Sequence, residues 1–438
     1  MQRAGEHPLG QTAEQFRIAF PRIVLGGGVA VLRRYAAIFR KGDLSGLEAF
    51  PVGGVNRVQT SESAEGTVVK FTQWVAGRKE GERLEAESVL IPMIGKRRVR
   101  AYTLCVSSQV GCAMGCGFCQ TAQMGLVRSL EAWEIVQQWF AASELLREAR
   151  RLRRADPEEA LAEPRGSLAD ASGSDKAALL DPEAEIRNIV FMGMGEPMDN
   201  LDAVMQSIGV LTGSRGPAIA PARVTVSTVG RIDGIERFAQ FVDRPGNHRI
   251  GLAVSLNAPN DEVRSRIMPI NRAMPMARLR EALLRWPFYA GKHLCIEYVL
   301  IPGVNDSPEQ ADELARYVKG RAMGVPTLDI PAAGVDERSH SQGLVRPPSL
   351  TLRAPMGGPY ADAPPLVGMV NVIPYNPREG SPWPAPTEDS VDAFVARLSS
   401  HGVYTKRRRT KGRDRMAACG QLGNLAYRRK PVGVTVSR

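Results

Sequence analysis

Six short runs of apolar, mostly β-branched residues constrain the fold of this chain more than any other feature. Each run is closed by Gly, Pro, Asn or Ser, and most are followed by a helix-compatible stretch such as residues 129–154. Near-continuous apolar runs of this kind are typical of parallel strands that are buried on both faces. The predicted strands are residues 101–106, 186–192, 223–228, 250–256, 295–301 and 367–373.

The alternation of strands with helices predicts βα units joined by right-handed crossovers. Six units form an α/β fold that is either a partial (βα)6 barrel or a doubly wound sheet. In both folds the functional residues lie beyond the carboxyl ends of the strands. Unusual residues occupy those positions here, namely Cys112, Gly195, Glu196, Ser227, Asn257 and Asn376.

The chain divides by pattern into an N-terminal region, a core and a short basic tail. In the N-terminal region, residues 1–100, the stretch 13–50 favours helices and 66–92 favours short strands. Residues 101–423 contain all six predicted strands and form the expected core. Residues 424–438 are the tail.

Two segments interrupt the alternation within the core. Residues 152–185 are charged and rich in Ala, Ser and Pro, whereas residues 322–366 are rich in Pro and Gly with scattered apolar residues. Long loops without structure of their own are uncommon inside compact domains. Both segments are therefore predicted to be peripheral insertions.

The charge balance favours a polyanionic partner. The formal net charge is +11 and the isoelectric point is near 9.6. Clustered Lys and Arg gain affinity for phosphates by releasing condensed counterions. Such clusters occur at residues 96–100, 150–154 and 406–415.

Cysteine usage and hydropathy indicate a reducing compartment. The first twelve residues are polar, unlike a signal peptide. No apolar run approaches the roughly 20 residues that span a bilayer. Six cysteines in 438 residues argue against a disulfide scaffold and favour metal or redox chemistry. We therefore expect a cytoplasmic protein with no membrane partner.

Three of the cysteines, Cys112, Cys116 and Cys119, form a C-x₃-C-x₂-C run directly after the first core strand. Three thiolates on one glycine-bearing loop can converge on one centre, but a closed zinc or iron–sulfur site usually has four ligands. Three ligands leave one position open, as a 4Fe–4S cluster that binds another molecule requires. The alternative is a zinc knuckle completed by a distant residue, although none of the five histidines is in a paired ligand spacing.

The segment FMGMGEP at residues 191–197 follows the second strand. Its glycines would allow a ligand to approach the backbone, and Glu196 can accept a hydrogen bond from a cationic amine. Ser227, Ser255 and Asn376 add small polar side chains at other strand ends. An ordinary turn, or a satisfied polar group at a strand end, is the alternative for each of these taken alone.

Eight ordered motifs together resemble the RlmN/Cfr family of radical S-adenosylmethionine RNA (adenine) methyltransferases, and RlmN in particular. The resemblance covers residues 85–423 apart from the two insertions. The motifs are the run from Cys105 to Cys119, FMGMGEP at 191–197, RVTVST at 223–228, AVSLNAPND at 253–261, PIN at 269–271, EYVLIPGVNDS at 297–307, VNVIPYNP at 370–377 and AACGQL at 417–422.

This resemblance implies a role for each matching position. Cys112, Cys116 and Cys119 would hold the 4Fe–4S cluster. Glu87 would accept a proton, Cys419 would carry the methyl group, and Cys105 would be its redox partner. The residues expected to contact S-adenosylmethionine are Gly195, Glu196, Ser227, Ser255, Leu256, Asn257 and Asn376.

The implied chemistry explains why a cysteine carrier is needed. Carbon 2 and carbon 8 of adenine have no nucleophilic lone pair, so direct methyl transfer from a sulfonium fails there. One S-adenosylmethionine would methylate Cys419, and reductive cleavage of a second would activate that methyl group for addition to the ring. Attack of the Cys105 thiol on the Cys419 sulfur would then release the base and leave a disulfide.

The implied partners are 23S rRNA, possible tRNA substrates and a one-electron reductant such as flavodoxin, and we expect a monomer. The N-terminal region would be a candidate for RNA binding. Methylation at carbon 8, a radical enzyme with another substrate, and a noncatalytic RNA-binding module are the competing interpretations.

Three residues depart from the family pattern or lie outside it. Asn257 stands where the family commonly has His, and Arg415 stands where an apolar residue is usual. Cys295 matches no functional cysteine and is expected to be an inert core thiol.

Overall fold

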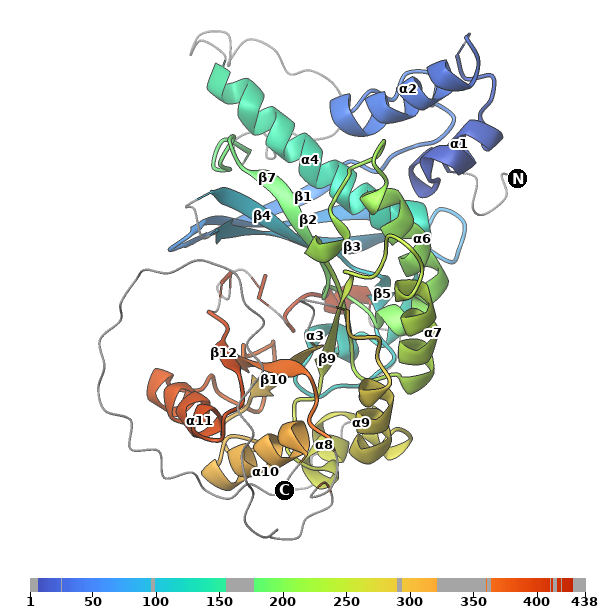
Figure 1. Ribbon diagram of the computed structural model, residues 1–438. Coiled ribbons are helices and arrows are strands. Elements are labelled where there is room, and N and C mark those ends of the chain that lie inside the picture. The colour runs from blue at the N-terminus through green and yellow to red at the C-terminus, as the bar shows by residue number, and fades with distance from the viewer. Residues whose placement is uncertain are drawn as a thin grey trace, which may run out of the picture.

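The core of the molecule is a curved ten-stranded sheet in a computed structural model (Figure 1). The structure describes residues 7–24, 26–95, 99–154, 177–289, 294–320, 360, 364–409, 411–412, 416–418 and 420–427. The strands follow one another in the order β1-β2-β3-β4-β7-β8-β9-β10-β11-β12. Their bounds are β1 Val55–Ser63, β2 Gly66–Ala76, β3 Arg83–Ile94, β4 Arg100–Cys105, β7 Glu185–Phe191, β8 Val224–Thr228, β9 Gly251–Ser255, β10 Leu294–Leu300, β11 Gly368–Pro374 and β12 Thr405–Arg407.

All six predicted core strands are confirmed, each within one residue at either end, as β4 and β7 to β11. They pair in parallel and in chain order, and β12 continues the series. A doubly wound sheet reverses its strand order at a switch point, whereas this order runs in one direction. The fold is therefore of the partial-barrel type, and the sheet formed by the described strands is open.

The N-terminal strands belong to the same sheet. β1, β2 and β3 form an antiparallel meander, and β3 pairs antiparallel with β4, which places Leu90 opposite Leu104. The expected strands within 66–92 are present as β2 and β3. The sequence patterns did not predict β1, whose sequence VNRVQTSES is largely polar, nor β12, which has only three residues.

Helices surround the outside of the curved sheet, whereas α3 lies inside the curve (Figure 1). Local capping explains several helix starts: Thr12 and Gln15 form a capping box at α1, and Ser307 and Gln310 form another at α10. The helices are α1 Ala13–Ala19, α2 Gly27–Lys41, α3 Gln120–Gln123, α4 Ala132–Arg154, α6 Leu201–Thr212, α7 Ile232–Val242, α8 Asp261–Ile267, α9 Met276–Leu284, α10 Pro308–Lys319 and α11 Glu388–Ser400.

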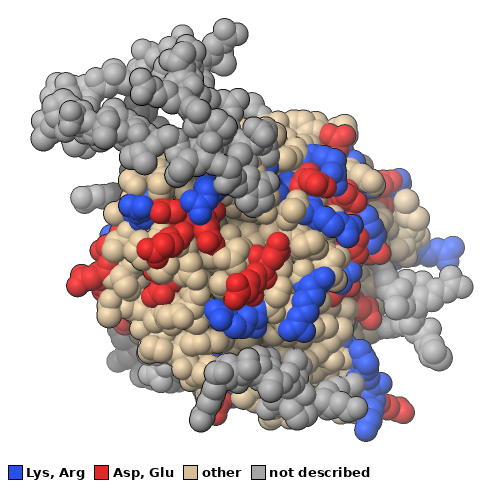
Figure 2. Space-filling view, turned by 90° about the horizontal axis from the view of Figure 1, so that it is seen from below, with Lys and Arg blue, Asp and Glu red and all other residues tan. Residues whose placement is uncertain are grey.

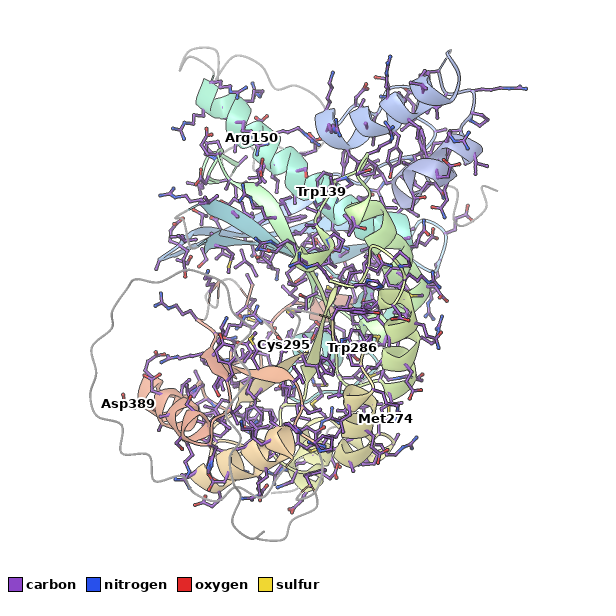
Figure 3. All side chains as sticks on the ribbon, in the orientation of Figure 1. Trp139, Arg150, Met274, Trp286, Cys295 and Asp389 are labelled. Carbon is purple, nitrogen blue, oxygen red and sulfur yellow. The ribbon has the colours of Figure 1, made fainter. Side chains whose placement is uncertain are left out.

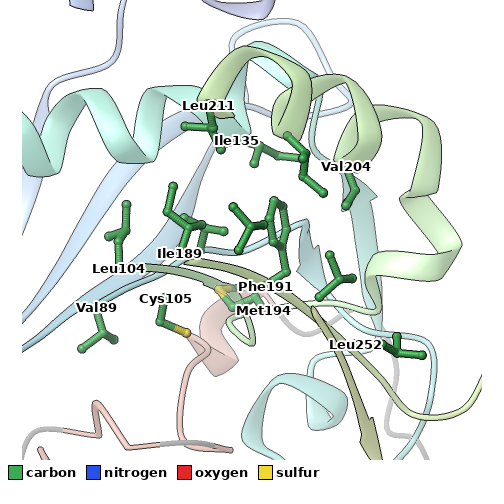
Figure 4. Close-up of a cluster of buried hydrophobic side chains, with 14 of the residues drawn as sticks. Val89, Leu104, Cys105, Ile135, Ile189, Phe191, Met194, Val204, Leu211 and Leu252 are labelled. Atoms are coloured by element: carbon green, nitrogen blue, oxygen red, sulfur yellow. The ribbon is translucent and has the colours of Figure 1, made fainter. Parts of the chain in front are cut away.

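The outer face of β4 and β7 packs against α4 and α6 (Figure 4). Leu104 and Ile189 from the strands meet Ile135, Val204 and Leu211 from the helices, and all five side chains are fully buried. Burial of each such side chain stabilises the fold by roughly 1.5–3 kcal/mol. This packed layer holds β4 and β7 in place. The loops that follow their carboxyl ends carry residues of the predicted site.

The two predicted insertions fall largely outside the described residues. Residues 155–176 of the first insertion, and residues 322–359 and 361–363 of the second, are not among those described. The described end of the first insertion is packed, because Ala177, Leu180 and Ala184 are buried before β7 begins. In the second, the Tyr360 ring lies under the Arg280 guanidinium, 5.4 Å from the ring centroid.

Acidification is expected to weaken the N-terminal packing through His7. Its ring stacks on Trp133 with the centroids 4.1 Å apart, and burial lowers the pKa of His7 from 6.5 to about 4. Between these values the unfolded chain binds the proton more readily, so the stabilisation is complete above pH 6.5 and is lost as the pH falls towards 4. The contribution is about 2 kcal/mol after solvent screening. Thermal melting at pH 7 and pH 4.5 should show a smaller pH-dependent loss in His7→Gln than in the wild type; equal losses would contradict this.

Candidate active site

The cysteine loop, residues 112–119, is closed at its base by a small hairpin. The hairpin pairs β5 (Gln109–Gly111) with β6 (Leu126–Ser129), and the Cys112 amide donates to the Gly125 carbonyl at 3.1 Å. Gly111 has a φ of +75°, and a Cβ there would lie 1.9 Å from the Gly125 oxygen. Only glycine allows this closure, which holds the start of the loop against the sheet.

The three thiols of this loop are largely removed from solvent. Burial raises the pKa of Cys112, Cys116 and Cys119, and the neighbouring thiols raise it further for Cys112 and Cys116. The thiols are therefore protonated unless a positive centre stabilises the thiolates, so cluster or metal binding must release protons. Within the described ranges, no three His, Cys, Asp or Glu side chains are arranged to hold a single metal ion.

One cavity at the carboxyl ends of the strands brings most of the predicted ligand-binding residues together. Leu256 and Asn376, at 1% and 4% exposure, are buried and do not line it. The predicted residues that line it are Cys112, Cys116, Cys119, Gly195, Glu196, Ser227, Ser255 and Asn257.

The glycines of FMGMGEP serve an internal contact that the sequence did not reveal. A Cβ on Gly193 would lie 2.7 Å from the Ser107 hydroxyl, and one on Gly195 would lie 2.5 Å from Gln109 Cβ. The Glu196 amide also donates to the Gln109 side chain at 2.9 Å. These glycines therefore let the loop after β7 pack against the loop after β4, which fixes Glu196 beside the cysteine loop.

Gly195→Ala is expected to destabilise the protein by about 2–4 kcal/mol, because it adds a clash with Gln109 to an unfavourable φ of +100°. Gly81→Ala is the matched control, with a φ of +77° and open space around the added methyl group. The control should cost about 1 kcal/mol. Urea unfolding measures the loss of unfolding free energy in both variants. Equal losses would contradict the expected clash between the added methyl group and Gln109.

The Glu196 carboxylate is buried and held by backbone amides. Its two oxygens accept from Met198 N at 3.0 Å and Val229 N at 2.9 Å. Burial raises the pKa of Glu196 to about 7, although these amides oppose the shift. An ammonium group in the cavity would favour the charged form, so the site suits a cationic amine.

Glu297 on β10 is a cavity residue that the sequence analysis missed. One oxygen, Oε2, accepts from Ser227 Oγ at 2.9 Å and lies 3.4 Å from Ser255 Oγ. The other, Oε1, is buried without a hydrogen bond from the described residues and lies 3.7 Å from an Arg408 nitrogen. One feature of the sequence could have identified Glu297: it is a carboxylate inside the apolar run CIEYVLI. Burying an acid costs free energy unless hydrogen bonds or a ligand compensate.

Arg264 is a second missed residue, fully buried beside the cysteine loop. Its guanidinium donates to Leu256 O at 3.0 Å and to Asn271 Oδ1 at 2.9 Å. The positive charge also lowers the pKa of Cys116, against the larger effect of burial. Arg264 therefore supplies a fixed charge that favours a thiolate at that position.

Asn257 adopts a left-handed backbone conformation with a φ of +57°. Its Oδ1 accepts from Val299 N at 2.9 Å, and its Nδ2 donates to Met268 Sδ at 3.4 Å. Asn and His are both enriched in this region of backbone space. The conformation therefore explains how Asn can replace the expected His without disturbing the loop.

Cys419 lies outside the described residues, but the residues that follow it are held at the cavity. The Gly420 carbonyl accepts from Gln120 N at 2.7 Å, and the Thr121 hydroxyl donates to the Leu422 carbonyl. Gly420 and Leu422 also line the cavity. The residues that follow Cys419 are thus attached to α3, directly after the cysteine loop and about three hundred residues earlier in the chain.

The same segment contacts the N-terminal strands through Glu87. The carboxylate accepts from the Gly423 amide at 3.0 Å and pairs with Lys70 Nζ at 2.8 Å. Lys70 also donates to the Met416 carbonyl at 3.2 Å. A buried ion pair on β2 and β3 therefore fixes the backbone both before and after Cys419.

Cys105 ends β4 and points to the face of the sheet opposite Leu104 (Figure 4). Cys105 pairs with Val89, and Val89 pairs with Lys70 on the other side. Directly paired residues share a face, and residues two apart in a strand do so as well. Cys105, Lys70 and Glu87 therefore project from the same face, where the Met416 carbonyl and the Gly423 amide are bound.

The other predictions concern the basic clusters, Cys295 and the membrane. Of the basic clusters, residues 96–98, 410 and 413–415 lie outside the described part of the chain. Cys295 is partly buried on β10, and burial raises its pKa to about 12. No helix among the described residues is both long and apolar enough to cross a bilayer.

Comparison with known proteins places the chain among named relatives, although no family model matches it. It is 32% identical over 430 residues to the "Probable dual-specificity RNA methyltransferase RlmN 1" of Protochlamydia amoebophila, covering 96% of this chain and 95% of that protein. It is 34% identical to the "Dual-specificity RNA methyltransferase RlmN" of Syntrophotalea carbinolica, covering 83% and 71%.

A solved structure agrees with these relatives. The crystal structure of a radical SAM methyltransferase from Sphaerobacter thermophilus matches with a TM-score of 0.67 and 28% identity, over 95% of this chain and 98% of that one. Together with the relative from Protochlamydia amoebophila, this match spans nearly the whole chain. The chain therefore belongs to the RlmN family of radical SAM RNA methyltransferases.

Proposed function

We propose that this protein methylates carbon 2 of an adenosine in 23S rRNA, and in tRNA, with Cys419 as the methyl carrier and S-adenosylmethionine as the methyl source. The observation that supports this most is the attachment of residues 416–423. Lys70 binds the Met416 carbonyl at one end, Gln120 of α3 binds the Gly420 carbonyl, and Glu87 binds the Gly423 amide at the other end. A stray thiol in a basic tail would need none of these contacts.

The residues around the cavity fit the cofactors that the family implies. Cys112, Cys116 and Cys119 would hold a 4Fe–4S cluster with one open iron. Glu196 would accept from the amino group of S-adenosylmethionine, and Glu297 with its two serines would accept from hydroxyl groups. The cluster would supply the electron that cleaves S-adenosylmethionine.

The proton and thiol chemistry would fall to residues of β3 and β4. Glu87 would remove the ring proton at carbon 2, and Lys70 with the Gly423 amide would hold its carboxylate in place. The Cys105 thiolate would attack the Cys419 sulfur, forming a sulfur–sulfur bond as the bond from that sulfur to the added carbon breaks, and the released carbon would keep the electron pair and take up a proton to become the methyl group. A reductant such as flavodoxin would supply the electrons for cluster reduction, and the disulfide must be reduced before the next turnover.

The position of methylation is tested on the product. The anaerobically reconstituted protein is incubated with S-adenosylmethionine, a reductant and either a 23S rRNA fragment or tRNA, and the digested nucleosides are compared with 2-methyl- and 8-methyladenosine by mass spectrometry. We expect 2-methyladenosine. Exclusive formation of 8-methyladenosine would assign the Cfr-type reaction, and no methylated adenosine from either RNA would overturn the proposal.

A further inference from the structure

A second cavity, of about 450 Å³, lies at the opposite end of the sheet from the cysteines. It is bounded by α2, α4, the start of β7 and the loop before β8. Because β7 has seven residues, its two ends are about 20 Å apart. This cavity therefore takes no part in the chemistry proposed for Glu87 and the cysteines.

Arginine dominates the charge of this cavity. Two arginines are fixed by the protein: Arg147 donates to Phe39 O at 3.3 Å, and Arg150 donates to Pro182 O at 2.8 Å. Three are exposed. Glu185, the single acid among the lining residues, pairs with Arg187 at 3.4 Å, and Glu144, outside the lining, pairs with Arg147, so the five arginines exceed the acids around them by three. The lining arginines are Arg40, Arg147, Arg150, Arg187 and Arg223. Such an excess of positive charge favours an anionic ligand.

The described surface at the opposite end of the molecule does not share this excess of arginine. Figure 2 views the molecule from the end that carries α8 and α10, where Lys and Arg are intermixed with Asp and Glu over the described surface. The arginine-lined cavity lies at the other end, beside α4, which carries Trp139 and Arg150 (Figure 3). A local concentration of guanidinium groups calls for its own explanation.

Trp139 supplies an independent observation. Its side chain lines the cavity and is only 8% exposed, and its Nε1 is buried without a hydrogen-bond partner among the described residues. Buried donors are rarely left unpaired in folded proteins, because the lost hydrogen bond to water is costly. An acceptor on a bound ligand would satisfy this N–H group.

The loop over residues 216–220 supplies a third observation. All five residues line the cavity, and Ala218 has a φ of +56°, in the left-handed region that alanine rarely adopts. The conformation costs about 1–2 kcal/mol. Such strain is found preferentially at ligand clamps and other functional sites.

We propose that this cavity binds a nucleotide through its phosphate, which would lie among the arginines and accept from Trp139 Nε1. Arginine is well suited to phosphate oxygens because its donors form a planar fork. The volume and the apolar walls at Phe39, Leu146 and Ile219 allow for more than the phosphate alone. The nucleotide is either part of the substrate RNA, which rests on the proposed function, or free in solution.

The test removes charge without touching the packed arginines. The variant Arg40→Gln/Arg187→Gln/Arg223→Gln changes only the exposed lining arginines, and Trp139→Phe removes the N–H group while retaining an aromatic ring. The matched control, Arg237→Gln/Arg244→Gln/Arg285→Gln, removes three arginines that contact Asp202, Phe241 and Glu236 elsewhere. Inorganic phosphate, adenosine 5′-monophosphate and a short single-stranded RNA are titrated into each full-length protein by calorimetry.

If the nucleotide belongs to RNA, the triple variant should bind the RNA on the order of 10-fold more weakly, and the slope of log K against log salt should fall by about 2. The KM for RNA should rise while kcat stays unchanged. If the nucleotide is free, the variant should lose binding of adenosine 5′-monophosphate and keep its RNA affinity. In either case Trp139→Phe should weaken binding of the affected ligand roughly 5-fold, and the control should match the wild type.

Wild-type affinities for all three probes in the triple variant and in Trp139→Phe would overturn the proposal, as would failure of the wild type to bind any probe. Binding is measured without catalysis. A wild-type protein that shows the expected binding but forms no methylated adenosine would therefore count against the proposed function alone.

Discussion

Cys116→Ser is expected to abolish iron binding and turnover together. Cys116 is 5% exposed in the cavity, beside Cys112, Cys119 and the buried Arg264. Loss of residues that merely support metal ligands costs 10–100-fold in affinity or activity, so loss of a ligand should cost on the order of 100-fold or more. Iron content after anaerobic reconstitution and the rate of 5′-deoxyadenosine formation measure the effect.

Cys295→Ser is the matched control for this prediction. It makes the same exchange on β10, at a partly buried thiol that does not line the cavity. It should keep wild-type iron content and deoxyadenosine formation. Full iron binding by Cys116→Ser, or equal losses in both variants, would contradict the assignment of the three cysteines as cluster ligands.

Cys419→Ala is expected to remove RNA methylation and leave iron binding intact. The methyl carrier is needed in every turnover, and removal of a covalent nucleophile commonly costs about 10⁴-fold or more. The contacts of Met416, Gly420 and Gly423 use backbone atoms, so alanine should not release the segment. Tritium transfer from methyl-labelled S-adenosylmethionine to RNA measures the loss, with Cys295→Ala as control.

Retention of methylation by Cys419→Ala would place this enzyme outside the carrier mechanism. It would favour a radical enzyme that acts on its substrate directly. Loss of both iron and methylation would instead show that the substitution disturbs the cysteine loop, through the contacts of Gly420 and Leu422 with α3.

The parallel strands could be predicted because the information that specifies them is local, whereas their order in the sheet could not be read from these runs. Apolar runs closed by turn residues marked β4 and β7 to β11 within one residue, and the strand ends marked the cavity. The C-x₃-C-x₂-C spacing and the FMGMGEP motif are also local. Their common location follows from the rule that parallel strands share one functional edge.

Long-range partners could not be predicted in this way. Lys70 and Glu87 hold a segment that begins 346 residues after Lys70, and no local pattern encodes that contact. Glu297 was hidden because its strand reads as continuous and apolar. The role of Gly195 was missed because the close approach is to Gln109 and not to a ligand. These contacts exist only once the sheet has formed.

The central claim is that Cys419 and Cys105 act as a pair on one RNA base, and covalent trapping tests it most directly. In the variant Cys105→Ala, the thiol that releases the base is absent. Incubation with RNA and S-adenosylmethionine should therefore accumulate a protein–RNA adduct, and digestion followed by mass spectrometry should locate an adenosine on the peptide that contains Cys419. Normal release of methylated RNA by this variant, with no adduct, would contradict the account.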